Sequence, residues 1–309
     1  MQIVRDYQYV RPGDRGASAA IGNFDGVHLG HRSVIDLARG RARDMSCPLG
    51  VVTFEPHPRE YFVPDGPVFR LMSAETRAHR LEKLGVERLY ELNFNAALSA
   101  LSADRFATDV IAGGFGLRHV VVGEDFRFGK GRAGDAEMLA GFGRKLGFGV
   151  TIAPLVADEK GEFSSTNIRR ALSEGRTLDA RRMLGHWHRI DGRVVSGDQR
   201  GRDLGYPTAN LELDRLHVPK FGVYAVLVDV LEGPHAGHYQ GAASIGLRPT
   251  FGGDHPNLEV YIFDFSGDIY GANVSVALVA FQRPELKFDT LDALTRQIDE
   301  DCIESRGIL

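Results

Sequence analysis

Two histidines, His28 and His31, stand three residues apart in the stretch IGNFDGVHLGH at residues 21–31. An apolar run precedes them and an amphipathic run follows, which predicts a strand, a tight turn at Gly26, and a helix that begins near Gly30. The first turn of a helix offers free backbone N–H groups and a partial positive charge, which suits phosphate. Imidazoles three residues apart lie on one side of that turn and can donate hydrogen bonds to phosphate oxygens, a protonated one adding charge.

The same pair also fits a structural interpretation, in which two partly exposed loop histidines flank a glycine turn. An isolated pair favours that interpretation. A metal site fits less well, because no third ligand with suitable spacing stands nearby. Two common phosphate motifs are absent: no G-x-G-x-x-G follows this strand, and GEDFRFGKG at 123–131 has one residue too many for a P-loop, with Gly131 where Ser or Thr is required.

A second candidate site lies in GRVVSGDQRGRDLGYPTANLEL at residues 192–213. Pro207 fixes the backbone ahead of Thr208 and Asn210, whose side chains lie on one side of an extended segment. Their neutral oxygens suit Mg²⁺ beside phosphate and water. The glycines that open the preceding loop are Gly197, Gly201 and Gly205. The alternative is a turn that merely leads into a strand.

The strand-like segment LEVYIFDF, at residues 258–265, carries an unusual carboxylate. A period of two places Glu259 on the same face as Tyr261 and Phe263. A carboxylate among aromatic rings is costly to bury unless it is paired or functional. It could therefore be a catalytic group, or it could pair with a nearby arginine such as Arg248 or Arg283.

The first half of the chain alternates apolar runs with amphipathic patterns. Five runs predict strands, at residues 17–22, 49–54, 88–92, 119–123 and 148–154. Three patterns predict helices, with buried faces formed by Val34, Leu37, Ala38 and Met45, by Phe106, Val110 and Ile111, and by Met138, Leu139 and Phe142. Alternation of this kind favours an α/β fold with a parallel sheet covered by helices.

Beyond about residue 185 the sequence becomes strand-like, with recurring turn signals and no intervening helix. This pattern favours a small antiparallel barrel or sandwich. Leu291, Leu294 and Ile298 then line one face of a closing helix, with Asp289 as its expected N-cap. We therefore expect two domains, over residues 1–185 and 186–309.

Composition limits the classes of protein to consider. The 309 residues are 43% apolar and 25% charged, as in ordinary soluble domains. No run approaches the length that spans a bilayer, and the N-terminal stretch is charged where a signal peptide would be apolar. Cys47 and Cys302 belong to no disulfide or zinc pattern. We expect a cytoplasmic protein that does not bind membranes.

Charge is unevenly spread. Residues 1–185 hold 26 Lys and Arg against 23 Asp and Glu, whereas residues 186–309 hold 11 against 18. Neither half has the basic excess of a nucleic-acid binder, so no nucleic-acid partner is expected. Small anionic ligands remain compatible with the first half.

At the level of motifs, GNFDGVHLGH resembles the HxGH signature of the nucleotidylyltransferase superfamily. With TFEPHP (53–58), VVGEDFRFGKGRAGD (121–135) and SSTNIR (164–169) it resembles the adenylyltransferase half of bacterial bifunctional riboflavin kinase/FAD synthetase. Further blocks resemble riboflavin kinase, namely GRDLGYPTANL, GVYAV, SIGLRPTFGG, LEVYIFDF, IYG and RPELKF. The resemblance covers roughly residues 15–306, with weaker matches at 73–85 and at Phe163.

The resemblance implies a Rossmann-like nucleotidylyltransferase domain with a parallel sheet, followed by a riboflavin-kinase-like six-stranded antiparallel β-barrel with a closing helix. It implies two activities: ATP phosphorylates riboflavin to FMN, and a second ATP adenylylates FMN to FAD with release of pyrophosphate. ATP and Mg²⁺ are the implied cofactors, and riboflavin, FMN and FAD are substrates and products.

Site residues follow from the resemblance position by position. In the first half it implies that His28 and His31 stabilise the reacting α-phosphorus, and that FMN lies near Asp125. ATP would contact Gly22, Asn23, Phe24, His28, His31, Ser164, Ser165, Thr166 and Arg169. The residue types agree, because SST is a helix-capping sequence and an arginine fork matches phosphate.

In the second half the resemblance implies that Glu259 is the base that accepts the proton of the ribityl 5′-hydroxyl. A hydroxyl is a weak nucleophile, so a positioned carboxylate is chemically sensible there. Mg²⁺ would bind Thr208 and Asn210. ATP would contact Gly197, Gly201, Arg202, Gly205, Pro207, Thr208 and Asn210.

Two alternatives stay open. A monofunctional enzyme could run one half of this chemistry, or the chain could be a non-catalytic flavin-binding or regulatory protein. We expect a monomer or a weak homo-oligomer. The roles of Asp25, His57 and Asp135 are also open, since a ligand contact and a structural role in a turn have the same sequence signature.

Overall fold

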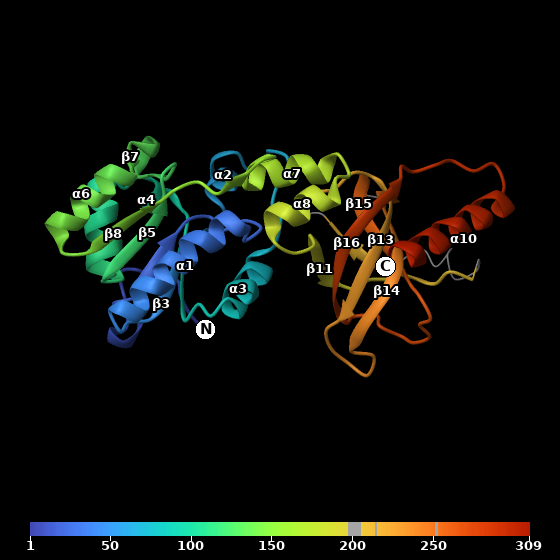
Figure 1. Ribbon diagram of the computed structural model, residues 1–309, viewed down its shortest axis with the longest axis horizontal. Helices are drawn as coiled ribbons and strands as arrows, with labels where there is room; N and C mark the ends of the chain where they lie inside the picture. Colours follow the sequence, from blue (N-terminus) through green and yellow to red (C-terminus); the bar gives the residue numbers. More distant parts are fainter. Residues whose placement is uncertain (197–204, 214, 251–252) are drawn as a thin grey trace. The chain divides into compact units, whose positions relative to one another are not determined.

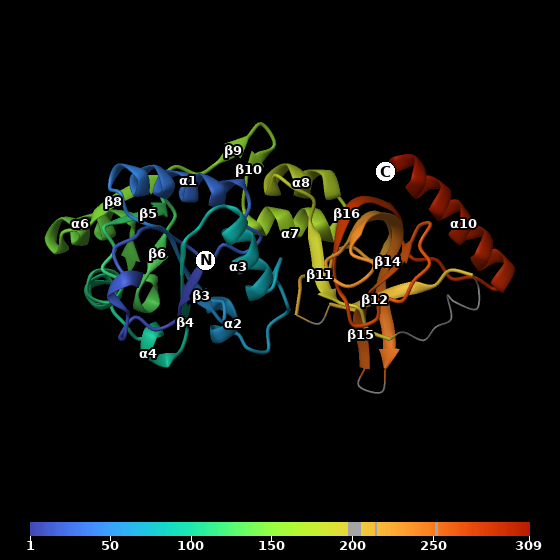
Figure 2. The same cartoon turned by 90° about the horizontal axis from the view of Figure 1, so that it is seen from below.

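The chain folds as two compact units, which Figures 1 and 2 show in two orientations. The structure, a computed structural model, describes residues 1–196, 205–213, 215–250 and 253–309. Unit 1 comprises Met1–Pro67 and Ala74–Ser164, and unit 2 comprises Val68–Ser73 and Ser165–Leu309.

Unit 1 is built on a six-stranded sheet in the order β1-β4-β3-β2-β5-β8, with every pairing parallel. The strands are β1 (Gln2–Val4), β2 (Ser18–Ile21), β3 (Leu49–Glu55), β4 (Arg88–Asn93), β5 (His119–Gly123) and β8 (Gly149–Ala153). Five of them confirm the strands predicted from apolar runs, and the parallel sheet confirms the α/β prediction. The edge strand β1 was not predicted, because its three residues are too short to show a pattern.

Helices and short hairpins surround this sheet. The helices are α1 (Leu29–Asp44), α2 (Pro58–Phe62), α3 (Ala74–Lys83), α4 (Ala96–Ser99), α5 (Ala103–Arg105), the π-helix η2 (Phe106–Gly114) and α6 (Ala136–Leu146), with 3-10 turns η1 (Pro12–Asp14) and η3 (Lys130–Arg132). Two hairpins pair β6 (Arg127–Phe128) with β7 (Gly134–Asp135), and β9 (Ala157–Asp158) with β10 (Gly161–Glu162). The predicted buried face of α1 was wrong in part: Leu37 and Met45 are exposed, and Ile35, Ala38 and Ala42 are buried.

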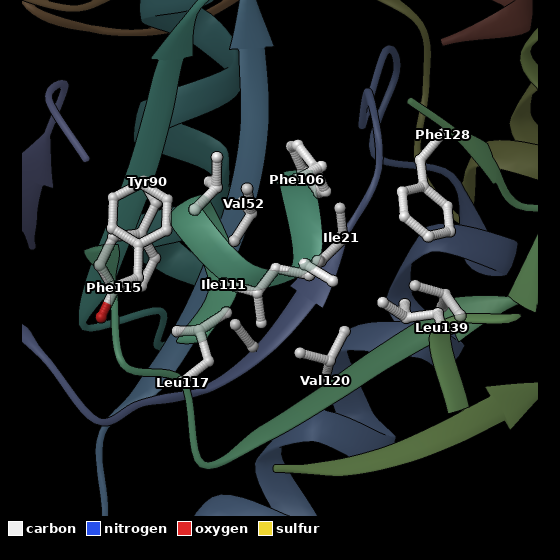
Figure 3. Packing of buried hydrophobic residues seen from close by; sticks show 14 of the residues in the cluster. Ile21, Val52, Tyr90, Phe106, Ile111, Phe115, Leu117, Val120, Phe128 and Leu139 are labelled. Atoms are coloured by element: carbon white, nitrogen blue, oxygen red, sulfur yellow. The ribbon is translucent and has the colours of Figure 1, made fainter. Parts of the chain in front are cut away.

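The two faces of the parallel sheet are covered differently. Figure 3 shows Ile21, Val52 and Val120, from three neighbouring strands, packed in one cluster with side chains of η2. On the opposite face the Ser18 hydroxyl donates a hydrogen bond to the Ala38 carbonyl of α1. This sandwich fixes the strands, so the loops that follow them leave from a rigid edge.

Unit 2 contains a six-stranded antiparallel sheet in the order β11-β16-β13-β14-β15-β12. The strands are β11 (Arg189–Arg193), β12 (Thr208–Glu212), β13 (Gly222–Val230), β14 (Gly237–Thr250), β15 (Gly253–Ile262) and β16 (Asn273–Arg283). An isolated bridge between Val195 and Asn210 brings the two edge strands together, so the sheet is a nearly closed barrel. This confirms the predicted small antiparallel barrel.

The described part of unit 2 contains the helices α7 (Ser165–Ser173), α8 (Thr177–Leu184) and α10 (Leu291–Ile308). The predicted closing helix is α10, but two details of its prediction were wrong. Thr290, not Asp289, is its N-cap, and Leu291 is exposed. The buried residues of this helix are polar. One of them, Asp301, accepts two hydrogen bonds, at 2.7 and 2.6 Å, from the Arg283 guanidinium of β16. A bidentate ion pair therefore attaches this helix to the barrel, and the pattern of apolar residues cannot reveal such a contact.

Candidate active sites

The strand order of unit 1 reverses between β2 and β5. From β2 the chain proceeds to β3 and β4 on one side, and from β5 to β8 on the other. Ligands of open parallel sheets bind at such a switch point, beyond the carboxyl ends of the strands. The loops at this place run from Gly22 to His28 and from Gly123 to Phe126, and the second contains the exposed Asp125. The predicted ATP histidines and the predicted FMN residue thus follow neighbouring strands at one edge.

The loop after β2 has an unusual backbone. Phe24, Gly26 and Val27 have φ angles of 53°, 85° and 43°, in the left-handed region that favours glycine. Two of the three are not glycine, and each such residue costs about 1–3 kcal/mol unless its surroundings hold it. The side chains of Phe24 and Val27 are fully buried, so the core holds this loop in shape.

His28 is the N-cap of α1. Its Nδ1 accepts a hydrogen bond from the backbone N–H of His31 at 3.3 Å, and the two rings stack with centroids 3.7 Å apart. A neutral His28 that accepts at Nδ1 carries its proton on Nε2, so Nε2 is then a hydrogen-bond donor. A side chain at Gly30 would lie 3.0 Å from the His28 ring and 3.1 Å from the Phe163 carbonyl, so glycine permits this close packing.

The His31 imidazole is held in its neutral form. Burial, and then the proximity of His28, lower the pKa of His31 well below its usual value. Its Nδ1 is buried and has no hydrogen-bond partner among the residues that the structure describes. A buried nitrogen of this kind fits a ligand with polar oxygens, such as a phosphate chain. The expectation of a protonated imidazole therefore does not apply to the free protein near neutral pH.

Acidification is expected to destabilise unit 1. His31 binds a proton more weakly in the folded chain than in the unfolded one, and so does His119, whose pKa burial and then Arg41 lower. The contribution of these two neutral histidines to stability is complete above about pH 6.5, the pKa of histidine in the unfolded chain, and is lost as pH falls below that value. The thermal midpoint, followed by circular dichroism from pH 7.5 to 5.0, should fall. In His31→Asn it should fall less, and an equal fall in both proteins would contradict this assignment.

One residue that supports the loop was missed by sequence reasoning. Arg77 of α3 is 2% exposed, and its Nη2 lies 3.0 Å from Glu55 and 3.3 Å from Glu91. Its Nη1 also donates to the Asn23 carbonyl at 3.4 Å, to which the buried Thr53 hydroxyl donates at 3.1 Å. Arg77 therefore braces the loop before His28 against the sheet. Glu91, a carboxylate within an apolar strand, was the signal that a buried cation should exist.

Replacing Arg77 by methionine is expected to destabilise unit 1 by about 3–5 kcal/mol, because it leaves buried carboxylate charge with less compensation. Urea unfolding followed by circular dichroism measures this loss. Arg41→Met is the matched control, since Arg41 forms an exposed pair with Asp44 at 3.7 Å. Such exposed pairs contribute at most about 1 kcal/mol. Equal effects of the two substitutions would contradict the bracing role.

The predicted triphosphate residues of the SSTNIR block stand at the start of α7. Ser164 ends unit 1, whereas Ser165, Thr166 and Arg169 belong to unit 2. Within unit 2, Nε of Arg169 donates to the Phe69 carbonyl at 2.6 Å, and its guanidinium lies 5.1 Å from the Phe69 ring centroid. Arg169 thus has a structural contact, and its grouping with the two histidines stays a prediction.

The structure gives structural roles to His57 and Asp135, two of the three residues whose roles the sequence left open. His57 caps α2 through a reciprocal pair of hydrogen bonds with the first turn, in which Glu60 takes part. Asp135 caps α6, accepting from the Met138 N–H at 2.8 Å. Asp25 is buried in the loop before His28.

The second site forms on the outer face of the barrel, where β12 pairs with β15. The register sets Asn210 opposite Glu259 and Thr208 opposite Tyr261. The alternate residues fill the barrel core, which turns these four side chains outward. Those core residues are Ala209, Leu211, Leu258, Val260 and Ile262. The predicted shared face of Glu259 and the aromatic rings is thus the outer face.

Of the two arginines expected to pair with Glu259, Arg283 forms its ion pair with Asp301 of α10 instead. The side chain of Arg248 lies outside the described residues, so its pairing with Glu259 stays a prediction. Asn257, two residues before Glu259, was missed by sequence reasoning. Its Nδ2 donates to Oδ1 of Asn210 at 3.1 Å and to Oε1 of Glu259 at 3.2 Å.

The segment that leads into β12 is held from α10. Tyr206 donates its hydroxyl hydrogen to Asp299 at 2.5 Å, and its ring meets Tyr261 edge-on at 5.3 Å. Gly205 has a φ angle of 87°, and Pro207 is exposed. The remaining predicted ATP contacts, Gly197, Gly201 and Arg202, lie outside the described residues.

The donors at this second site suit magnesium held together with phosphate. Among the described residues, no group of three or more His, Cys, Asp and Glu side chains could hold a metal ion. Thr208 and Asn210 instead present neutral oxygens on one face, beside the carboxylate of Glu259. Mg²⁺ is commonly bound by few protein oxygens together with substrate phosphates and water, so the residues fit the ion.

Taken together, a parallel sheet with histidines at its carboxyl edge and a small antiparallel barrel with polar oxygens on its outer face are the features expected of a transferase that handles nucleotide phosphates at two separate sites. Comparison with known proteins narrows the class. The family model described as FAD synthetase matches residues 11–167, and that described as riboflavin kinase matches residues 184–309.

Full-length relatives agree with both matches. A bifunctional riboflavin kinase/FMN adenylyltransferase from Pseudomonas fluorescens is 41% identical over all of this chain and 98% of its own. Its counterpart from Escherichia coli K12 is 38% identical, covering 94% of this chain and 92% of its own. The chain belongs to the bifunctional riboflavin kinase/FMN adenylyltransferase family. Enzymes of this family make flavin cofactors from ATP and flavin substrates with a divalent metal.

A solved structure supports the fold over the whole chain. A crystal structure described as a macrolide-efflux protein from Streptococcus pneumoniae aligns with a TM-score of 0.85 at 34% identity, covering 99% of this chain and 98% of that one. In this chain, none of the helices within the described ranges has the length and apolar character needed to cross a membrane.

Proposed function

We propose that residues 186–309 phosphorylate riboflavin to FMN and that residues 1–185 adenylylate FMN to FAD. The observation that carries this division is the presence of a different phosphate-handling arrangement in each compact unit. Unit 1 offers two stacked imidazoles at a helix N-terminus, whereas unit 2 offers a carboxylate beside neutral oxygens. The first suits an anionic nucleophile and the second suits a hydroxyl.

In the kinase step, Glu259 accepts the proton of the ribityl 5′-hydroxyl as its oxygen attacks the γ-phosphorus, and ADP leaves. A general base of this kind contributes about 10²–10⁴-fold to the rate. Thr208 and Asn210 would hold Mg²⁺, which when bound would supply positive charge to the nucleotide phosphates. The outward face of the β12–β15 pair, where Asn210 lies opposite Glu259, supports these roles.

In the adenylylation step, a phosphate oxygen of FMN attacks the α-phosphorus of ATP, and pyrophosphate leaves. The nucleophile is already ionised, so no base is required. His28 and His31 donate hydrogen bonds to the phosphate oxygens as charge builds up on them, and the free N–H groups of α1 add to this stabilisation. Gly22, Asn23 and Phe24 shape the loop that brings the backbone to the nucleotide. Ser164, Ser165, Thr166 and Arg169 hold the triphosphate, and Asp125 lies near FMN.

One assay separates this proposal from its rivals. The full chain is incubated with riboflavin, ATP and Mg²⁺, and in parallel with FMN, ATP and Mg²⁺, and flavins are separated by chromatography. We expect FMN and FAD in the first reaction, with release of ADP and pyrophosphate, and FAD in the second. FMN alone, or FAD from FMN alone, would show a monofunctional enzyme. Flavin binding without turnover would show a binding protein.

We further propose a cytoplasmic monomer or weak homo-oligomer without a nucleic-acid partner. A net charge of −4, with no basic excess in either half, supports the last point. Two free cysteines without a bridge are compatible with a reducing compartment. Size-exclusion chromatography with light scattering tests the oligomeric state.

A further inference from the structure

Asn257 links the two functional groups of the barrel site, although no role has been assigned to it. The residue is 7% exposed on β15, two positions before Glu259 and on the same outward face. Its single amide nitrogen lies 3.1 Å from Oδ1 of Asn210 and 3.2 Å from Oε1 of Glu259. Asn210 itself is 4% exposed, so its hydrogen bond with Asn257 is shielded from water, whereas Glu259 is exposed.

The hydrogen bonds fix which way each amide points. A carboxylate at neutral pH is purely an acceptor, so the group of Asn257 that faces Glu259 must be its NH₂, which has two hydrogens for two acceptors. Asn210 turns its own Nδ2 toward the Thr208 carbonyl at 3.4 Å, which leaves Oδ1 facing Asn257. The network therefore runs in one direction, from Asn257 to the base and from Asn257 to the amide oxygen of Asn210.

We propose that Asn257 is a positioning residue for the kinase reaction, which acts by donating one hydrogen bond to Glu259 and one to Asn210. The bond to Glu259 stabilises the ionised carboxylate, the form that can take a proton from a substrate hydroxyl. The bond to Asn210 orients the amide oxygen that binds the metal–nucleotide complex. The inference rests on the proposed roles of Glu259 and Asn210.

The position in the sheet explains why one residue can serve both groups. Asn257 lies opposite Glu212 on β12, one outward pair beyond the Asn210–Glu259 pair. A side chain there points in the same direction as both of its partners and is one step away from each. Because β14 pairs with the other edge of β15, with Gly246 opposite Asn257, the strand that carries the network is fixed on both sides.

The test uses three substitutions in the full chain. Asn257→Leu removes both donated hydrogen bonds at similar size, Asn257→Asp places a carboxylate against Glu259, and Asn257→Thr retains one donor. The rate of FMN formation is measured from pH 5 to 9 at saturating and at limiting Mg-ATP. Gln240→Glu, an amide-to-carboxylate change at an exposed position of β14, is the control.

We expect the acidic limb of the kcat profile to move to higher pH by about one unit in Asn257→Leu, because a hydrogen bond to the charged form is lost. It should move further in Asn257→Asp, because like charges oppose ionisation, and by an intermediate amount in Asn257→Thr. The KM for Mg-ATP should rise several-fold in Asn257→Leu. Gln240→Glu should leave both quantities unchanged.

Circular dichroism and thermal unfolding of the same preparations report whether the barrel is folded, and conversion of FMN to FAD reports on the first half of the chain. A kcat profile that keeps its acidic limb in folded variants would overturn the inference. If Asn257→Leu fails to fold, the shifts of the acidic limb in Asn257→Asp and Asn257→Thr decide the question. Glu259→Gln distinguishes a failure of the proposed base from a failure of the role inferred for Asn257. If this variant retains kinase activity, the proposed base is wrong. If it is inactive while the Asn257 profiles are unmoved, the inference alone fails.

Discussion

Replacing His31 by alanine is expected to impair the conversion of FMN to FAD severely and to leave the conversion of riboflavin to FMN intact. The loss should be about 10²–10³-fold in kcat, the effect typical of removing one hydrogen-bond donor to a developing oxyanion. The residue is suited to this role because its buried Nδ1 lacks a partner among the described residues and its ring stacks on His28 at a helix N-terminus. The kinase step should be spared, since Glu259 and Asn210 lie on the barrel of unit 2.

Initial rates of both half-reactions, each started from its own flavin, measure this selectivity. His119→Asn is a matched control, because His119 also has a lowered pKa but lies at the beginning of β5, away from the carboxyl edge of the sheet. We expect His119→Asn to retain FAD formation. Loss of both half-reactions in a folded His31→Ala protein would contradict separate sites, and unchanged FAD formation would contradict the role of the imidazole.

The second large effect is the reverse. Glu259→Gln should reduce FMN formation from riboflavin by about 10²–10⁴-fold, because the amide cannot accept the hydroxyl proton while the side chain keeps its size. Production of FAD from added FMN should continue at the rate of the unmodified chain. Glu259→Gln should not unfold the barrel, since the barrel core contains the alternate residues of β12 and β15.

Glu212→Gln provides the control for this experiment. Glu212 is an exposed carboxylate on β12, one outward position beyond Asn210, and undergoes the same chemical change. We expect its kinase activity to be retained. A Glu259→Gln protein that phosphorylates riboflavin at an undiminished rate, or a Glu212→Gln protein that loses as much activity, would show that the base lies elsewhere.

The elements of the fold were largely predictable from local patterns. Strands such as β3 and β5 are buried on both faces, so they appear as continuous apolar runs, and the helix after His28 begins where its glycine turn indicates. Which face of a helix is buried was less predictable. Leu37 was expected inside α1 but is exposed, because the choice between adjacent helical faces depends on which strands lie beneath.

The supporting residues of both sites were not predictable. Arg77 lies in an amphipathic helix, where an arginine ordinarily faces solvent, and its burial depends on carboxylates of β3 and β4. Asn257 is one polar residue in a strand, and its importance follows from a register that sets Asn210 beside Glu259 across β12 and β15. Such partners are distant in sequence, so composition and spacing do not identify them.

Alternation along β15 has a consequence for how such a protein can change over generations. Residues that keep the barrel folded and residues that we propose act on the substrate occupy opposite sides of the same strand. Drift or selection can therefore alter the chemistry of the outer side while the scaffold persists, and an inactive descendant would remain a stable module. The same separation makes this strand pair a favourable starting point for directed evolution toward other hydroxyl-bearing acceptors.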